Sequence, residues 1–449
     1  MQMHASLAKI LGKSVQWGLR TFFRKSGASL PGKLAIKVDP DILKFLAKDY
    51  EIIVVTGTNG KTLTTALTVN ILRQQFDHIL TNPTGSNMIQ GIVSTFLEAK
   101  PSKTEKNFAV LEIDEASLSK VMKYIQPKLF VFTNIFRDQM DRYGEIYTTY
   151  QMLLDGTAQA PEAIVLCNGD SPIFHSTTMK NPQKYYGFDH LPDVEQLAHY
   201  NTEGVLCPNC QHILHYRMIT YANLGNYYCP NCEFHRPKLD IRLSKLKKVT
   251  PVFSEFVVDE EEYRIEAGGM YNVYNALAAI AVAKHYQIDS KKIRKGLNIE
   301  KKVFGRQESI LIDGKCINII LVKNPVGLNQ VIDMLGLIAS PFTLATLLNA
   351  NYADGIDTSW IWDGNYEKLT KMSLSKVIAA GGRHQEMYRR LLVAGIQKEN
   401  LIKAEHGFDQ LLKEIKSAPT NKIYVLATYT AMLDLRKNFA SAGFLKGGF

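Results

Sequence analysis

Continuous apolar segments, each about as long as one strand, alternate with helical patterns along the first part of the chain. One helical pattern begins at Thr62 and another covers 116–125. Apolar strands separated by helices are typical of a parallel sheet with helices on both faces. The pattern therefore predicts an α/β fold, with strands at IIVV (52–55), FAVLEI (108–113), LFVFTNI (129–135) and AIVLCNGD (163–170).

Polar residues stand at the ends of three of these predicted strands, namely Thr56, Glu112 and Asn134. Ligands of parallel sheets bind beyond the carboxyl ends of the strands, where the connecting loops meet. We therefore expect these three side chains to converge on one site.

The remaining pattern predicts further units. Strand patterns occupy 253–266, an Ala-rich helical pattern follows at 272–286, and a new unit begins near 304. A chain of 449 residues with 46% hydrophobic content can bury two or three cores. We predict an N-terminal basic helical segment, a central domain with a cysteine-containing insert at 200–237, and a C-terminal domain, with bounds of 1–45, 46–303 and 304–449.

The N-terminal segment combines apolar residues at nearly helical spacing with cations. The apolar positions are Leu7, Leu11, Val15, Leu19 and Phe22 or Phe23, and the cations are Lys9, Lys13, Arg20, Arg24 and Lys25. Such a helix can lie on a membrane surface or dock on its own domain, and periodicity does not choose between them. The formal net charge of +10 fits nucleic acid, a phosphate-rich substrate or an acidic lipid surface. The longest apolar runs are too short to span a bilayer.

The sequence TGTNGKT at 56–62 follows the first strand and precedes a helix. Gly57 and Gly60 allow backbone N–H groups to converge on phosphate oxygens, with Thr58 and Asn59 between them. Lys61 would neutralise the outer phosphates, and Thr62 offers a hydroxyl to Mg²⁺ at the helix start. The spacing is G-x-x-G-K-T, shorter than the usual phosphate loop, so an ordinary turn is the alternative.

Four cysteines form two C-x-x-C pairs, Cys207 with Cys210 and Cys229 with Cys232. This spacing predicts a zinc ribbon, and four thiolates leave no open position for catalysis. His212, His215 and His235 are not needed as ligands. Cys167 and Cys316 stand alone and are predicted to be buried thiols. Paired cysteines without a secretory leader favour a reducing cytoplasm.

Several motifs together resemble the Mur ligases, ATP-dependent amide-forming enzymes of cell-wall synthesis related to folylpolyglutamate synthase. They are GTNGKT, then LEIDE (111–115), TNIFRDQMDRYG (133–144), GGMYNVYNALAAIAVA (268–283) and FGRQE (304–308). The resemblance implies a central P-loop ATPase domain with a parallel sheet and a four-cysteine zinc-ribbon insertion, followed by a smaller α/β C-terminal domain. It also implies ATP and Mg²⁺ as cofactors, in addition to Zn²⁺ in the ribbon.

The resemblance assigns roles to individual residues. Glu112 would complete the Mg²⁺ shell begun by Thr62, and Asn134 would line the same region together with Asp138. Gln139 stands where many Mur ligases have His, and no counterpart of their modified lysine is evident, which leaves a second metal site in doubt. Asn275 would recognise adenine and Arg306 would contact the nucleotide; capping by Asn272 and a surface salt bridge of Arg306 are the plain alternatives.

The segment NYADGIDTSWIWD at 351–363 narrows the resemblance to Mur ligases that work with a separate glutamine amidotransferase subunit of the GatD type. In that group an aspartate of this loop orients the catalytic His of the glutaminase, and Asp357 matches it. Asp354 could instead face the substrate or nucleotide. A solvated acidic turn is the alternative for both.

The resemblance implies a subunit that uses ATP to amidate the α-carboxyl of D-glutamate in the lipid II stem peptide, giving D-isoglutamine through an acyl phosphate. Lys61 and Mg²⁺ would stabilise the transferring phosphoryl group. The expected location is the cytoplasm, at the inner face of the cell membrane. One alternative is a stand-alone ligase that joins an amino acid to a carboxylate. Another is a nucleic-acid-binding protein, which is disfavoured because the ribbon lacks clustered cations and aromatics; we therefore expect no nucleic acid partner.

Overall fold

The predicted strands form the centre of the fold in the computed structural model, which describes residues 2–23, 29–82, 85–138, 145–189, 196–197, 205–298 and 308–445. Within these residues, nine strands form one sheet in the order β12-β11-β10-β6-β5-β4-β1-β3-β2. The first seven of them in sequence are parallel, and the last two are antiparallel. Their bounds are β1 (Glu51–Thr56), β2 (His78–Thr81), β3 (Asn107–Glu112), β4 (Leu129–Phe132), β5 (Ile164–Asn168), β6 (Gln183–Phe188), β10 (Ile241–Val249), β11 (Ser254–Val258) and β12 (Glu261–Ile265).

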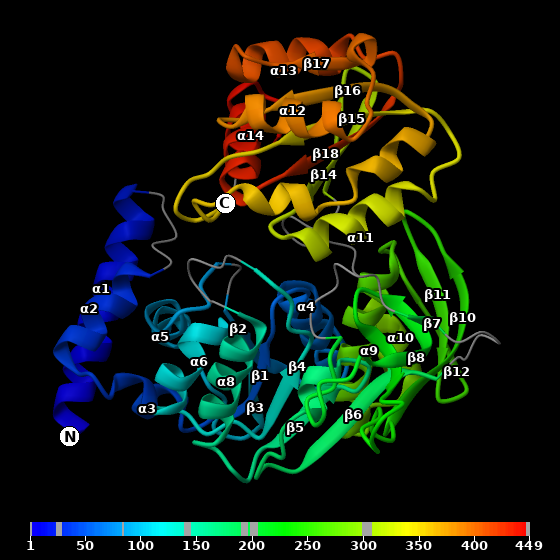
Figure 1. Cartoon of the computed structure of the whole chain (residues 1–449). Coiled ribbons are helices and arrows are strands. Elements are labelled where there is room, and N and C mark those ends of the chain that lie inside the picture. The colour runs from blue at the N-terminus through cyan, green and yellow to red at the C-terminus, as the bar shows by residue number, and fades with distance from the viewer. Residues whose placement is uncertain are drawn as a thin grey trace.

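Helices cover both faces of this sheet, as the continuous apolar strands predict. In β1, Ile53 and Val55 bury in one core while Ile52 and Val54 bury in the other, because successive side chains point to opposite faces. The first core is closed by α4 (Lys61–Leu72), α9 (Met270–His285) and α10 (Ser290–Leu297). The second is closed by α3 (Ile42–Ala47), α5 (Ile89–Glu98), α6 (Glu115–Met122) and α8 (Ile146–Thr157). The expected parallel α/β fold is confirmed (Figure 1).

The N-terminal segment is helical, as predicted, and forms α1 (Gln2–Phe23) and α2 (Leu30–Val38). Helix α1 docks on the second core through small residues: Ala5 and Ala8 are buried, and a Cβ on Gly12 would lie 2.6 Å from Leu97 Cδ1. The opposite face of α1 is exposed and apolar. Docking on the chain itself therefore uses only part of the helix surface. In the described part of the chain, no helix is both long and apolar enough to cross a membrane.

The cysteine insert lies between β6 and β10 and contains a small antiparallel sheet of β7 (Gln196–Leu197), β8 (His215–Tyr221) and β9 (Leu224–Tyr228). A short 3₁₀ helix, η1 (Pro172–His175), follows β5. We call residues 205–237 the ribbon and the nine-stranded sheet with its helices the central unit.

The C-terminal unit, residues 308–445, has its own sheet. Six strands of this part form a sheet in the order β13-β14-β18-β15-β16-β17, and all of them are parallel except β13. The strands are β13 (Glu308–Ile312), β14 (Lys315–Leu321), β15 (Phe342–Leu347), β16 (Leu374–Ala380), β17 (Leu401–Lys403) and β18 (Lys422–Ala427). The helices are α11 (Pro325–Leu335), η2 (Ser359–Asp363), η3 (Tyr366–Lys371), α12 (His384–Val393), η4 (Lys398–Asn400), α13 (Gly407–Lys416) and α14 (Tyr429–Ser441). The smaller α/β unit predicted here is confirmed, and α11 faces the central unit (Figure 1). The predicted boundary near 304 lies outside the described residues.

Candidate active site

A cavity of about 310 Å³ lies between the central and C-terminal units. The phosphate-loop residues Thr58 to Thr62 line it from the central unit, together with Glu112 and Asn134. Lys323 and Asp354 line it from the C-terminal unit. The three strand-end residues expected to converge therefore do lie at one edge, although Thr56 itself is buried below the cavity floor and does not line it.

The phosphate loop connects β1 to α4 and depends on two glycines with positive φ. Gly57 has φ of +125° and Gly60 has φ of +86°. A Cβ on Gly57 would lie 2.4 Å from Thr133 Oγ1, and a Cβ on Gly60 would lie 2.0 Å from Asn275 Oδ1. Only glycine fits both the backbone conformation and the space. The two glycines are therefore required by the shape and the surroundings of the loop, and phosphate binding by the loop stays a prediction.

The segment after β4 holds this loop from below. Asn134 is buried, and its side chain accepts a hydrogen bond from Asn59 N (2.9 Å) and donates one to Asn59 O (3.1 Å). Thr58 Oγ1 accepts from Phe136 N at 3.1 Å, and Thr133 Oγ1 donates to Asn59 O at 2.8 Å. Because the Asn134 side chain bonds both the N–H and the C=O of Asn59, it shapes the loop backbone. The N–H groups left for an anion are those at the start of α4.

Lys61 is buried at the start of α4. Its ammonium lies 3.2 Å from both Oε1 and Oε2 of Glu115 and 2.5 Å from Gly57 O. Burial lowers the pKa of Lys61, but the carboxylates of Glu115, Asp114 and Glu112 outweigh burial and raise it above its ordinary value. Burial raises the pKa of Glu115 above its ordinary value, although Lys61 partly offsets this rise. Lys61 is therefore a fixed cation beside the phosphate cradle.

Further carboxylates line the same cavity as Lys61. Glu112 and Asp114 line the cavity at the end of β3, and both are buried. Asp138 Oδ2 pairs with Lys323, while its Oδ1 is buried without a hydrogen-bond partner. Carboxylate oxygens beside a threonine hydroxyl are the ligand types that Mg²⁺ prefers. Glu112 and Thr62 are thus brought to one cavity as predicted, and their role as Mg²⁺ ligands stays a prediction.

Two residues of the C-terminal unit in this site were missed by the sequence reasoning, Lys323 and Asn324. Asn324 caps α11, accepting from Gly327 N at 2.8 Å. It also exchanges two hydrogen bonds with the Asn59 side chain, at 3.1 and 3.3 Å. The local signal was present, because Lys-Asn-Pro after an apolar strand is typical of a strand end followed by a capped helix.

The two asparagines of α9 differ in their contacts. Asn272 Nδ2 donates to Gly268 O at 2.7 Å, just before the helix, but its side chain accepts no backbone N–H of α9, so the capping alternative is not borne out. Asn275 lines the cavity, and its side chain donates to Asn272 Oδ1 at 3.3 Å. Recognition of adenine by Asn275 stays a prediction. Arg306 and Gln139 lie outside the described residues.

The two aspartates of the 351–363 loop differ in their burial and in their hydrogen bonds. Asp354 is buried, lines the cavity and accepts from Thr430 N at 2.7 Å, so its carboxylate caps the start of α14. Asp357 is exposed and bonded to Ser359 N and Oγ, both at 2.8 Å. The Ser359 backbone hydrogen bond, followed by that from its hydroxyl, lowers the pKa of Asp357. Asp357 is therefore a charged surface group outside the cavity lining.

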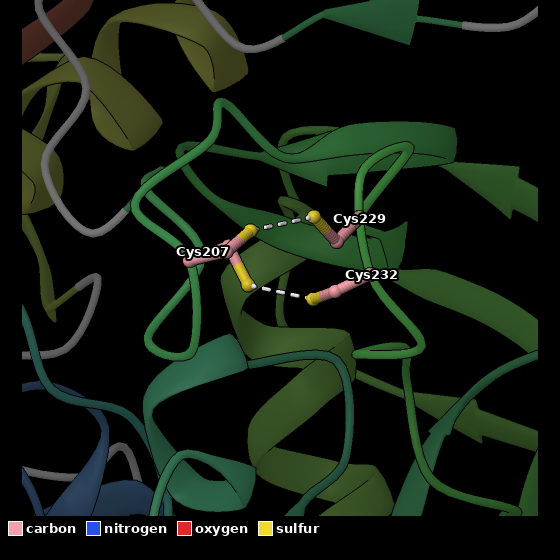
Figure 2. A group of neighbouring side chains, drawn as sticks. Cys207, Cys229 and Cys232 are labelled. Atoms are coloured by element: carbon pink, nitrogen blue, oxygen red, sulfur yellow. Dashed lines mark hydrogen bonds between the residues drawn. The ribbon is translucent and has the colours of Figure 1, made fainter.

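The four ribbon cysteines are brought together as predicted. Their sulfurs lie within 4.8 Å of one another, with separations of 3.5 Å for Cys207–Cys232 and 3.4 Å for Cys210–Cys229. Figure 2 shows the sulfurs pointing toward each other from two facing loops. This donor set fits a tetrahedral Zn²⁺ ion.

The remaining cysteines and histidines follow the sequence predictions with one exception. Cys167 is fully buried, and burial raises its thiol pKa. Cys316 was also predicted to be buried but is half-buried, because it lies near the start of β14. His212 and His235 are exposed and lie outside the cysteine cluster, as does His215.

Comparison with protein families identifies the fold and the group. A model of the Mur ligase middle domain matches residues 55–283, and a model of the MurT ligase C-terminal region matches residues 321–432. The chain belongs to the MurT group of the Mur ligase family. It is 55% identical over 441 residues to the protein named lipid II isoglutaminyl synthase (glutamine-hydrolyzing) subunit MurT from Streptococcus pneumoniae, covering 98% of each chain.

Other relatives of this MurT-group chain agree with that assignment. The subunit of the same name from Staphylococcus aureus strain COL is 36% identical, with 83% of this chain and 84% of that relative covered. Among solved structures, a pseudomurein peptide ligase type C from Methanothermus fervidus superposes with a TM-score of 0.65 at 23% identity, covering 90% of this chain and 80% of that one. At that identity, the similarity to the pseudomurein peptide ligase supports the fold alone.

The geometry of the phosphate loop predicts how a methyl group added at Gly60 would affect nucleotide binding. Gly60→Ala should reduce nucleotide binding at least about 100-fold, because its Cβ would meet Asn275 Oδ1 and displace the loop. Gly314→Ala is the matched control: Gly314 has φ of +77° and nothing within 4 Å of its Cβ position, so it adds backbone strain without a clash. Isothermal titration of both variants with ATP and Mg²⁺ measures the difference. Equal affinities would contradict this view of the loop.

Proposed function

We propose that this chain is the ATP-dependent synthetase subunit that amidates the α-carboxyl of D-glutamate in the lipid II stem peptide, producing D-isoglutamine. The observation that carries the proposal is the 55% identity to a subunit of that name over 98% of both chains. The cavity supports it with a phosphate cradle, a buried cation and several carboxylates at one edge of the sheet. The nitrogen would come from glutamine through a partner subunit.

The chemistry requires activation of a carboxylate, because attack by ammonia on an unactivated carboxylate would have to expel oxide or hydroxide. ATP, held with Mg²⁺, would supply the phosphoryl group for an acyl phosphate. Lys61 would hold positive charge against the outer phosphates, and Glu115 keeps its ammonium in place. Thr62 and Glu112 would hold the metal. The C-terminal unit, through Lys323 and α11, would exclude water from the cavity.

Asn275 and Arg306 complete the proposed nucleotide site. Asn275 lines the cavity beside Gly60, where its amide would meet the nucleotide. Arg306 lies outside the described residues, and its place in the proposed site rests on the resemblance of FGRQE (304–308) alone.

The proposed partner is a glutamine amidotransferase subunit of the GatD type, which would dock against the 351–363 loop. Tyr352, Ile356 and Trp362 are exposed on this loop, as is Asp357. Exposed large apolar side chains on the same loop as an exposed carboxylate are typical of a binding surface. Asp357 would cross the interface and orient a catalytic His of the partner, as buried carboxylates do for imidazole.

The proposed reaction is tested by mass spectrometry of lipid II incubated with this chain, ATP and Mg²⁺, with either ammonium salt or glutamine plus the partner subunit. Conversion of one carboxylate to an amide with release of ADP is expected. Lys61→Ala should lower the rate at least about 1,000-fold while partner binding, measured by gel filtration, stays intact. No mass change under either nitrogen source, with ATP still bound, would favour a stand-alone ligase.

The Asp357→Asn variant distinguishes glutamine hydrolysis in the proposed partner subunit from amidation in this chain. The variant should lower glutamine-dependent amidation about 100-fold or more, because a neutral amide cannot stabilise an imidazolium. Ammonium-dependent amidation and ATP affinity should stay within about twofold, since Asp357 does not line the cavity. Asp409→Asn, at an exposed aspartate of α13 outside the cavity lining, is the control and should leave both activities unchanged. Unchanged glutamine use in the Asp357 variant would move the role to another residue.

We also propose Zn²⁺ as the ion held by Cys207, Cys210, Cys229 and Cys232. Metal analysis should find one zinc per chain. Cys232→Ser should lose most of the metal and expose the ribbon to limited proteolysis, because the ion contributes folding free energy. Cys167→Ser, at a buried lone thiol, should keep the full metal content. Full zinc content after Cys232→Ser would contradict the assignment.

The apolar outer face of α1 is the proposed contact with the inner membrane surface. Leu7, Ile10, Leu11 and Trp17 are 42 to 63% exposed and share one side of the helix, with Lys13 exposed beside them. Apolar side chains flanked by lysine fit an anionic lipid surface. A membrane-borne substrate such as lipid II would be met there.

Vesicle sedimentation tests this face. Wild type should bind phosphatidylglycerol vesicles more strongly than phosphatidylcholine vesicles. Combined Leu7→Ser and Ile10→Ser should weaken binding at least about tenfold, since each lost side chain removes roughly 1.5 kcal/mol of burial. Leu311→Ser, at another exposed leucine in β13, should have no effect. Loss of partner binding in place of vesicle binding would assign α1 to the glutaminase.

A further inference from the structure

The ribbon shares a hydrophobic core with the helices that build the nucleotide site. Met218, Tyr221 and Leu224 of β8 and β9 belong to the same buried cluster as Leu67 of α4 and Val273 of α9. The ribbon's own small core, around its cysteines, is a separate cluster. One side of the ribbon is therefore built around the metal site, and the other side is part of the central unit.

A buried carboxylate fixes the orientation of the ribbon. Asp170, at the end of β5, is 0% exposed and accepts hydrogen bonds from Arg236 Nη1 (3.0 Å), Tyr274 OH (2.7 Å) and Phe188 N (2.8 Å). Arg236 follows the second cysteine pair, and Tyr274 belongs to α9. Tyr274 OH also lies 2.8 Å from Thr220 Oγ1, next to Tyr221. Asp170 therefore holds the end of the ribbon through Arg236, and it holds the residue next to Tyr221 through Tyr274.

Tyr221 places its ring in the wall of the cavity. Its side chain is 7% exposed and lines the cavity together with Tyr271 and Val326. Tyr271 and Val326 pack against the same hydrophobic cluster that contains Tyr221, so all three bring apolar surface to the wall of the cavity. The carboxylates and lysines come instead from strand ends and the phosphate loop. A phosphate chain fits the charged part, and a planar aromatic base fits this apolar part.

A second contact couples the Tyr221 ring to the phosphate loop. The ring centroid of Tyr221 lies 6.0 Å from that of Phe136 and 5.6 Å from that of Tyr274. Phe136 is the residue whose backbone N–H and C=O both bond to Thr58 Oγ1 in the loop. The aromatic wall and the cradle are thus held at a fixed distance.

We infer that Tyr221 contacts the base of the bound nucleotide, so that the ribbon supplies part of the nucleotide site and the metal-held fold of the ribbon sets nucleotide affinity. This inference rests on the proposed use of ATP. It goes beyond a purely structural zinc site, because it gives the ribbon a ligand-contacting residue. Stacking of a base on an aromatic ring is sequence-tolerant but requires the ring itself.

The test compares ATP with inorganic tripolyphosphate, which carries the phosphate chain without a base. Isothermal titration in the presence of Mg²⁺ should give Tyr221→Leu an ATP affinity about tenfold lower than wild type, which corresponds to roughly 1.4 kcal/mol. Its tripolyphosphate affinity should stay within about twofold. Leucine keeps apolar volume in the core, so the fold is retained, and Tyr221→Phe should restore ATP affinity. Tyr228→Ala, in the same ribbon but outside the cavity lining, is the matched control.

Removal of the metal provides a second test of this inference. Chelation of zinc from the full chain should lower ATP affinity while leaving tripolyphosphate affinity largely unchanged. Equal losses for both ligands in Tyr221→Leu, or no loss for either, would overturn the inference while leaving ATP use intact. Wild type that binds neither ligand would instead overturn the nucleotide assignment itself.

Discussion

The structure depends on how the backbone of Asn59 is held. Asn134 and Thr133 bond both sides of its peptide from below, while Asn324 of the C-terminal unit bonds its side chain from above. The turn between two positive-φ glycines has few favourable contacts of its own, so its shape is set by these partners. The same residue thereby fixes the phosphate cradle and the position of the second unit over it. The phosphate loop and part of the inter-unit contact thus meet at one residue.

Much of this fold could be predicted from the chain because its signals are local. A few neighbouring residues are enough to predict the strand at 52–55, the glycine loop and the two cysteine pairs. All three are found in the structure. The contribution of the C-terminal unit could not be predicted in the same way. Asn324 meets Asn59 across 265 positions, and only the three-dimensional fold brings them together. Glu115 was read as part of a motif, but its pairing with Lys61 depends on how α6 begins.

The acidic loop illustrates why residue type alone could not separate Asp354 from Asp357. Both follow one strand and both fit a turn. Their difference is hydrogen bonding: the buried one caps α14 through Thr430, and the exposed one bonds within its own turn to Ser359. The charge of Asp354 therefore serves a helix terminus, whereas that of Asp357 is held at the surface. The resemblance singles out this loop, and the hydrogen bonds distinguish its two aspartates.

The contact between the two units combines interactions of different kinds. The Asn59–Asn324 pair is neutral, whereas Arg137–Asp363 is an ion pair with a separation of 3.9 Å and side chains that are about half exposed. Dissolved salt screens exposed ion pairs but leaves amide pairs almost untouched. Raising the ionic strength should therefore weaken the exposed part of the contact first. The Asn59–Asn324 pair and the partly buried Lys323–Asp138 pair would keep the two units in the same relative position when the surface charges are screened.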